Sequence, residues 1–213
     1  MTALKAAKNR LRNREFTTAE ASAMLGLSGV QVNNLIDELA QLGIAHAGDR
    51  KRAIEHRGLF SLKLCRDLIL WGVGPALRLK VIRAALDAPR KKFVSIAGTN
   101  ISAIQVGNYR KEASDRIREL QSAEGAVSSK REIMQGEPCM RGTRIPAYWV
   151  ADIVEADGVA EAKKTYPQLT EKQIRSAHLY AMANPRRGRP KVIEWPVGRA
   201  KKGRSRTRTA TLD

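Results

Sequence analysis

Apolar side chains between residues 16 and 45 recur every three or four positions, which is the spacing of one face of a helix. The pattern divides into two short segments, and each predicts a helix with one buried face. The expected inner positions are Ala19, Ala23 and Met24 in the first helix, and Val32, Leu35, Ile36 and Leu39 in the second.

Capping signals mark where these two helices begin and end. Thr17 with Glu20 and Ser28 with Gln31 each have the spacing of a capping box. Gly26 lies between the two segments and suits the left-handed residue that ends a helix. Two short helices joined by a glycine turn are typical of a helix-turn-helix.

Residues 46–58 are polar and basic, and they alternate around Ala53 to His56. We interpret them as a β-hairpin that forms the wing of a DNA-binding domain; an ordinary solvated loop is the alternative. Two further helices follow. One is expected to be capped by Ser61 and to stop at Gly72, and the other has Pro75 as its first residue.

The middle of the chain has a different pattern. Residues 91–106 place apolar residues on both sides of a turn-like Gly-Thr-Asn, which predicts a short β-hairpin. A charged segment with an expected Glu112–Arg116 pair follows, and it predicts a connecting helix that ends near Gly125. We interpret residues 125–130 as a linker.

Three helical pieces are expected after Pro146, because Gly158 and Pro167 interrupt the apolar pattern. A third capping box, Thr170 with Gln173, opens the last piece. The predicted inner positions are Trp149, Ile153, Val159, Ala162, Leu169, Ile174, Ala177 and Ala181.

The predicted fold is therefore mainly α. It comprises an N-terminal winged helix-turn-helix, a short β-hairpin, a three-helix domain with helix-turn-helix character, and an extended basic tail. The predicted boundaries are 1–14 for a basic arm, 15–90 for the winged domain, 91–130 for the hairpin and connecting helix, 131–185 for the three-helix domain, and 186–213 for the tail.

Charge narrows the function classes. The 39 Lys and Arg residues against 21 acidic ones give a net charge of +18, which favours nucleic acid or an acidic protein as the partner. From Arg186 onward there are ten basic and two acidic residues, so the tail carries +8 and the remaining chain is basic as well. No apolar run approaches the roughly 18 residues that span a bilayer, and we expect neither a secretory leader nor a membrane partner.

The stretch GEPCMRGTRIP, from Gly136 to Pro146, is the densest candidate for chemistry. It lacks the spacing of a phosphate-binding loop, and Cys139 has no second ligand for a metal and no second thiol for redox chemistry. We expect turns at its glycines, capping by Thr143, and carbonyl or acidic partners for Arg141 or Arg144. No enzyme activity, cofactor or metal is expected, and Cys65 and Cys139 are interpreted as small core residues.

The same stretch resembles domain-of-unknown-function family 433. The shared residues are Gly136, Pro138, Arg141 to Pro146, Tyr166-Pro167, Leu169-Thr170, and Ile174-Arg175 with Ala177. The family commonly has Lys where Glu137 stands, and acids where Lys163 and Lys164 stand. The N-terminal half is similar to the winged domain of mercury-resistance-type regulators, and Phe60 to Leu62 support that similarity.

The resemblance implies an antitoxin of a bacterial type II toxin–antitoxin pair, with a PIN-like ribonuclease toxin as its protein partner. As an antitoxin, the protein is expected to act as a homodimer within a hetero-oligomer and to repress its own transcription at double-stranded operator DNA. The two isolated cysteines fit a reducing cytoplasm, so a cytoplasmic location is expected. The alternatives are a stand-alone helix-turn-helix regulator and an RNA- or ribosome-associated basic protein.

Two sets of site residues follow. The expected DNA contacts are Ser28, Gln31, Asn33 and Asn34 at the start of the second helix, with Arg50, Lys51 and Arg52 in the wing. The expected toxin contacts are Arg186, Arg187, Arg189, Lys191 and Trp195 in the tail.

Overall fold

The computed structural model describes residues 14–48, 52–98 and 103–186. This part of the chain is mainly helical, with two small antiparallel sheets, in agreement with the predicted mainly α class. Its seven α-helices are α2 (Thr18–Leu25), α3 (Gly29–Leu39), α4 (Leu59–Leu70), α5 (Pro75–Asp87), α6 (Val106–Ala126), α7 (Ala147–Thr165) and α8 (Glu171–Ala183). The strands are β1 (Glu15–Thr17), β2 (Ala45–Ala47), β3 (Arg52–Glu55), β4 (Val127–Ser128) and β5 (Cys139–Met140).

The predicted pair of short helices is present as α2 and α3. Both capping boxes form, with the side chains of Thr17 and Ser28 each accepting the backbone N–H three residues later. Gly26 ends α2 with φ 64°, a left-handed conformation that glycine adopts without steric cost. The predicted starts of both helices and the predicted end of α2 are therefore confirmed. Helix α3 continues into a 3₁₀ turn (Ala40–Leu42) that ends at Gly43.

A β-hairpin follows these helices, as the alternation in the sequence predicts. Strands β2 and β3 are antiparallel, with Ala45 opposite Ile54. The sequence did not predict a third strand, but β1 pairs with the other edge of β3 and places Phe16 opposite Ile54. Sheet order β1-β3-β2 thus ties the start of α2 to the base of the hairpin.

Helix α4 begins earlier than predicted. Its first residue is Leu59 and its N-cap is Gly58, which makes no side-chain cap. Ser61, the predicted cap, is completely buried in the helix, so that prediction is wrong. The cause is the apolar pair Leu59-Phe60, which the fold buries as the first turn of α4. Pro75 is the first residue of α5, as predicted.

The middle segment differs from expectation in two ways. In place of a full hairpin, the described residues form a single antiparallel bridge between Val94 and Ile104. The connecting helix α6 begins at Val106, which was assigned to that hairpin, and it runs for 21 residues. Glu112 bonds Lys63 of α4 instead of the predicted Arg116, which pairs with Glu119.

The segment expected to be a linker contains β4, which pairs with β5 through Val127 and Met140. Helix α7 follows, and Gly158 interrupts it with φ 87° and ψ 174°, so three helical pieces lie after Pro146 as predicted. The third capping box, Thr170 with Gln173, opens α8. Trp149 is 44% exposed, so its predicted place on the inner face is wrong.

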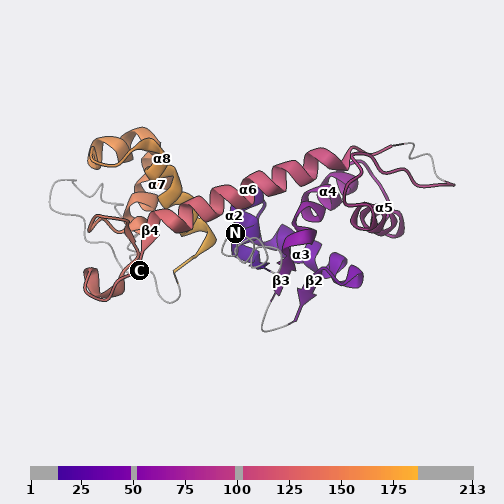
Figure 1. Ribbon diagram of the computed structural model, residues 1–213, viewed down its shortest axis with the longest axis horizontal. Helices are drawn as coiled ribbons and strands as arrows, with labels where there is room; N and C mark the ends of the chain where they lie inside the picture. The colour runs from indigo at the N-terminus through magenta and orange to yellow at the C-terminus, as the bar shows by residue number, and fades with distance from the viewer. Residues whose placement is uncertain (1–13, 49–51, 99–102, 187–213) are drawn as a thin grey trace, which may run out of the picture.

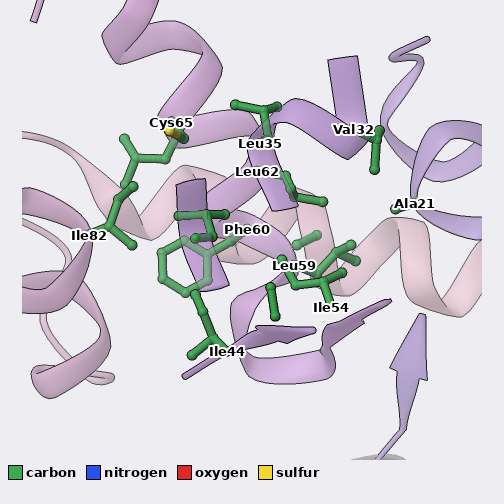
Figure 2. Close-up of a cluster of buried hydrophobic side chains, with 14 of the residues drawn as sticks. Ala21, Val32, Leu35, Ile44, Ile54, Leu59, Phe60, Leu62, Cys65 and Ile82 are labelled. Carbon is green, nitrogen blue, oxygen red and sulfur yellow. The ribbon is translucent and has the colours of Figure 1, made fainter. Parts of the chain in front are cut away.

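Two apolar cores result. The larger one unites α2 to α6 with the sheet, and Figure 2 shows part of it, where Leu35 of α3, Ile54 of β3 and Leu62 of α4 converge. The smaller core joins β4, β5, α7 and α8. Figure 1 shows α6 crossing between the two, with α4 and α5 near its start and β4 at its end.

The two cores are also joined by α8. This helix packs against α2 and α6, and Ala183 at its end is buried in the larger core. Arg14 adds an ionic link, because its guanidinium lies 2.6 Å from Glu20 of α2 and 2.5 Å from Glu124 of α6. The C-terminal helical segment is thus packed directly onto α2. This helix belongs, with α3 and the β2–β3 hairpin, to the predicted DNA-reading unit, which is called the reading unit below. No helix in the described part of the chain is both long and apolar enough to cross a membrane.

One enclosed ion pair links α3 and α5 in the larger core. Arg78 of α5 forms two hydrogen bonds with Glu38 of α3, at 2.8 and 2.9 Å, and donates a third to the carbonyl of Val73. The two side chains are only 12% and 17% exposed. Cys65 of α4 lies beside them and is fully buried. Little solvent is available here to replace a lost partner.

We predict that Glu38→Gln lowers the free energy of unfolding by about 3 kcal/mol, because it leaves an enclosed guanidinium without its counter-charge. Urea denaturation followed by circular dichroism measures this loss. Arg116→Gln, in an exposed pair with Glu119, is the matched control and is expected to stay within about 0.5 kcal/mol of the unmodified chain. Equal effects of the two substitutions would contradict the structural role of the Arg78–Glu38 pair.

Candidate functional site

The first half of α3 has an exposed face that could meet a ligand. Val32, Leu35 and Ile36 are buried, as predicted, so the helix is held by its opposite side. On the outer side, Val30 is 70% exposed and Asn34, one turn later, is exposed as well. Val30 was not among the predicted site residues, although its apolar side chain at a solvent-facing helical position was a usable signal.

Ser28 and Gln31 have structural roles at the start of α3. Gln31 N–H donates to Ser28 Oγ at 3.2 Å, and Ser28 N–H donates to Gln31 Oε1 at 3.0 Å. Both residues are exposed at the N-terminal end of α3, which is where the DNA contacts are predicted. Gln31 uses its oxygen in the cap, which leaves its amide NH₂ group for an outside partner.

Asn33 and Asn34, which are adjacent in the sequence, face different ways. Asn33 is half-buried and accepts a hydrogen bond from Thr18 Oγ1 at 2.8 Å, so it fixes α3 against α2. No described residue hydrogen-bonds the side chain of Asn34. Of the two, only Asn34 is exposed and has both its amide oxygen and its NH₂ group free of bonds to described residues.

The hairpin beside α3 supplies one described cation of the predicted set. Arg52 in β3 bonds Asp37 Oδ1 at 2.7 Å and the carbonyl of Asn33 at 3.4 Å. This links the hairpin to α3 and neutralises an acid on its surface. Arg50 and Lys51 lie outside the described residues.

The loop between α6 and α7 has the turn-forming role that its glycines predict. Gly136 and Gly142 have φ values of 87° and 79°, and Gly142 belongs to the tight connection between β5 and α7. Thr143 closes that connection: its hydroxyl donates to the carbonyl of Met140 and accepts Ile145 N–H. It therefore stabilises a turn and caps no helix, and Pro146 is the N-cap residue of α7.

Arg141 and Arg144 at this turn are exposed, and neither has an ion pair within the described residues. The predicted internal partner for one of them is therefore not present there. Together with the half-exposed Trp149, they leave polar and aromatic groups of the C-terminal segment open to solvent.

Cys139 is not available for chemistry. It is 1% exposed, and burial, with a smaller contribution from Glu137, raises the pKa of its thiol. Burial also raises the pKa of Cys65 to about 12. Both cysteines are free and buried, as predicted for core residues. Within the described residues, no three His, Cys, Asp or Glu side chains gather into a set that could hold a metal ion.

Arg186 is the one residue of the predicted toxin-binding set that the structure describes. Its guanidinium lies 3.0 Å from Glu137 Oε1 and 4.4 Å from the centre of the Tyr148 ring. Tyr148 in turn donates to the carbonyl of Asn184 at 2.7 Å. These contacts fix the point at which the tail leaves the C-terminal segment. Arg187, Arg189, Lys191 and Trp195 lie outside the described residues.

Comparison with known proteins identifies the C-terminal part of the chain. Residues 127–181 match the family described as "Protein of unknown function (DUF433)", so the C-terminal region carries a DUF433 domain. This confirms the resemblance drawn from the loop and the helices after it. The similarity of the N-terminal half to mercury-resistance-type regulators stays a prediction.

One curated relative is the "Uncharacterized protein y4eO" of Sinorhizobium fredii (strain NBRC 101917 / NGR234). It is 41% identical over 86 residues, which are 40% of this chain and 39% of that protein. The chain therefore spans well under half the length of this relative. No solved structure matches the chain.

We predict that neither cysteine reacts with iodoacetamide in the folded protein at pH 8. Raising the pKa of a thiol lowers its thiolate fraction at a given pH, and the thiolate is the nucleophile. Intact mass spectrometry should show no adduct under native conditions and two adducts in urea. A rapid single adduct that disappears in a Cys139→Ser variant would show that the loop cysteine is accessible after all.

Proposed function

We propose that the protein is the antitoxin of a type II toxin–antitoxin system, which binds its operator DNA through α2 and α3 and neutralises a PIN-like ribonuclease through its C-terminal part. It acts as a binding protein with no catalytic activity of its own. The observation that carries the proposal is the direct packing of a DUF433 domain, through α8, onto a pair of capped helices with an adjacent hairpin.

In this proposal, α2, α3 and the β2–β3 hairpin form a winged helix-turn-helix. The N-terminal residues of the second helix of such a motif contact base edges in the major groove. Val30 and Asn34 lie one turn apart on the exposed face of α3. An Asn side chain can pair with the adenine edge, and an apolar side chain can contact the thymine methyl group.

The charge distribution supports a proposal in which the face of α3 supplies sequence specificity and the basic residues elsewhere attract the DNA. Helix α3 contains Asp37 and Glu38 and no basic residue, but Arg52 and Arg78 neutralise both acids. The reading face thus does not repel phosphates. The chain's net charge of +18 provides the attraction, which carries no sequence information by itself.

Contact with the toxin is assigned to the basic tail. Nucleases of the PIN-like class are expected to hold a metal through clustered carboxylates, and arginine can pair with carboxylates in a bidentate manner. Because Arg186 is held by Glu137 and Tyr148, the tail starts from a defined place on the DUF433 domain. Arg187, Arg189, Lys191 and Trp195 would then extend from this anchor toward the partner.

A stand-alone transcription regulator is the second candidate. The features of α3 support it equally, because they concern DNA alone. In that case the tail would only add phosphate contacts, and its removal would mainly reduce the salt dependence of DNA binding. Neutralisation of a co-encoded nuclease separates the two functions.

We predict that Asn34→Ala weakens binding to the DNA upstream of the protein's own reading frame by about tenfold, because a bidentate base contact contributes about 1–3 kcal/mol. Fluorescence anisotropy at fixed ionic strength measures this effect. Asn108→Ala, at an exposed position on α6, is the matched control. If both variants bind like the unmodified chain, α3 is not the reading helix.

We also predict that a chain ending at Arg186 keeps its fold and DNA binding but loses neutralisation of the co-encoded nuclease. It retains every described contact, including that of Arg186 with Glu137. The measurement is growth rescue on co-expression, together with co-purification of the two proteins. A chain whose residues 187–213 are replaced by a Gly/Ser segment of equal length is the control for tail length. Full-strength neutralisation by either altered chain would refute the role of the tail.

A further inference from the structure

A groove of about 540 Å³ lies on the larger core, between the base of the β2–β3 hairpin, the C-terminal end of α5 and the side of α6. Its floor is apolar and consists of Leu42, Ile44, Phe60, Leu86, Ala113 and Ile117. Figure 2 shows the ring of Phe60 directed toward Ile44, where the floor begins. None of the predicted DNA or toxin contacts that the structure describes lines it.

The rim of this groove carries more basic than acidic side chains. Arg57, Arg83 and Arg110 line it, and Asp87 is the only carboxylate among the described lining residues. Arg57 is already paired with Glu55, at 2.6 Å, so Arg83 and Arg110 are the two cations that matter for a ligand. Arg83 is exposed and has no partner within the described part of the chain. The groove therefore presents positive charge that no internal acid fully balances.

Among the three arginines that line the groove, Arg110 is the one held in place by several hydrogen bonds. It donates to the carbonyls of Ala85, at 2.6 Å, Ala88, at 3.1 Å, and Lys91, and its guanidinium lies 5.3 Å from the centre of the Phe60 ring. These bonds fix it at the edge of the apolar floor. None of its described partners is a carboxylate, and burial lowers its pKa. An anion placed beside it would supply the missing counter-charge.

The size of the groove indicates what kind of occupant fits. Small-molecule sites typically have about 300–1,000 Å³ and combine an apolar lining with a few oriented polar groups. A stable protein interface needs about 800 Å² of surface from each partner, far more than the exposed lining here. The groove therefore suits a small ligand better than a protein partner.

We propose that this groove binds a small organic anion with an apolar body, whose carboxylate meets Arg83 and Arg110 and whose body covers Phe60 and Ile117. Charge-assisted hydrogen bonds to arginine orient the acid group, and the floor buries the apolar part. The site does not depend on the proposed antitoxin function. It does lie against Leu42 and Ile44, in the connection from α3 to β2, and against Arg57, in the turn after β3, so a bound ligand would contact the segments that flank α3 and the hairpin.

The test uses the full chain without DNA and decanoate as the probe, with decan-1-ol as the neutral control of equal length. Chemical shift changes in ¹⁵N-labelled protein report the site and the affinity. We expect saturable decanoate binding that shifts amides around Phe60 and Ile117, and at least fivefold weaker binding of decan-1-ol. Because no DNA or toxin is present, the outcome is independent of the proposed function.

Three variants make the test specific. Arg83→Gln is expected to weaken decanoate binding about fivefold or more and to leave decan-1-ol binding unchanged. Lys80→Gln, which removes the same charge from an exposed position on α5 outside the groove, is expected to bind decanoate normally. Ser114→Trp places a large ring in the groove and is expected to abolish binding. Circular dichroism checks that each variant is folded.

Several results would overturn the proposal. These are equal affinity for decanoate and decan-1-ol, equal effects of Arg83→Gln and Lys80→Gln, or shifts confined to residues away from the groove. Saturable binding of an acidic amphipathic peptide with none of decanoate would assign the groove to a protein partner instead.

Discussion

The packing of α8 on α2 and α6 is the constraint on which the arrangement of the chain depends. Helix α6 contributes to the larger core through Ala113, Ile117 and Leu120 and then leads into β4 of the smaller one. Helix α8 returns from the smaller core, and Ala183 is buried beside α2. Arg14 reinforces this closure with ion pairs to Glu20 and Glu124. The C-terminal helix α8 therefore packs back onto α2, which is the first helix of the proposed reading unit.

This closure has a physical consequence for binding. Helix α2 is held on one side by the Thr18–Asn33 hydrogen bond to α3 and on another by α8. Displacing α8 would expose apolar surface on α2 and α6, at a cost of about 25 cal/mol for each Å² returned to water. A ligand at the DUF433 domain can therefore influence α3 only if it interacts differently with packed and displaced states of α8.

The ends of most helices could be predicted from residues that are close together in the sequence. The strand pairings and the contacts between distant segments could not. The three capping boxes, Gly26 and Pro75 act within a few residues, so their signals are complete in the sequence. The pairing of β1 with β3 and of β4 with β5 joins segments of two to four residues, too short for a periodicity to be read. Glu112 shows the same limit, because the helical spacing to Arg116 was correct but Lys63 of another helix was the partner. Ser61 followed a valid capping preference that burial of Leu59 and Phe60 overrode.

The candidate site was predictable as a helix end but not residue by residue. Ser28, Gln31, Asn33 and Asn34 are all polar residues at the start of one helix, and the sequence cannot tell which of them the fold itself uses. Ser28 and Gln31 bond each other, which leaves only the amide NH₂ group of Gln31 for a partner, and Asn33 bonds α2. Asn34 therefore has the one fully uncommitted side chain of the four, beside the exposed Val30. Internal hydrogen bonding thus removes candidates that polarity alone retains.

With Asp37 and Glu38 neutralised by Arg52 and Arg78, the face of α3 has no charge of its own to steer it toward phosphates. If it reads DNA, attraction must come from basic residues elsewhere in the chain. Discrimination must come from Val30, Asn34 and the amide NH₂ group of Gln31, so salt should alter affinity much more than specificity.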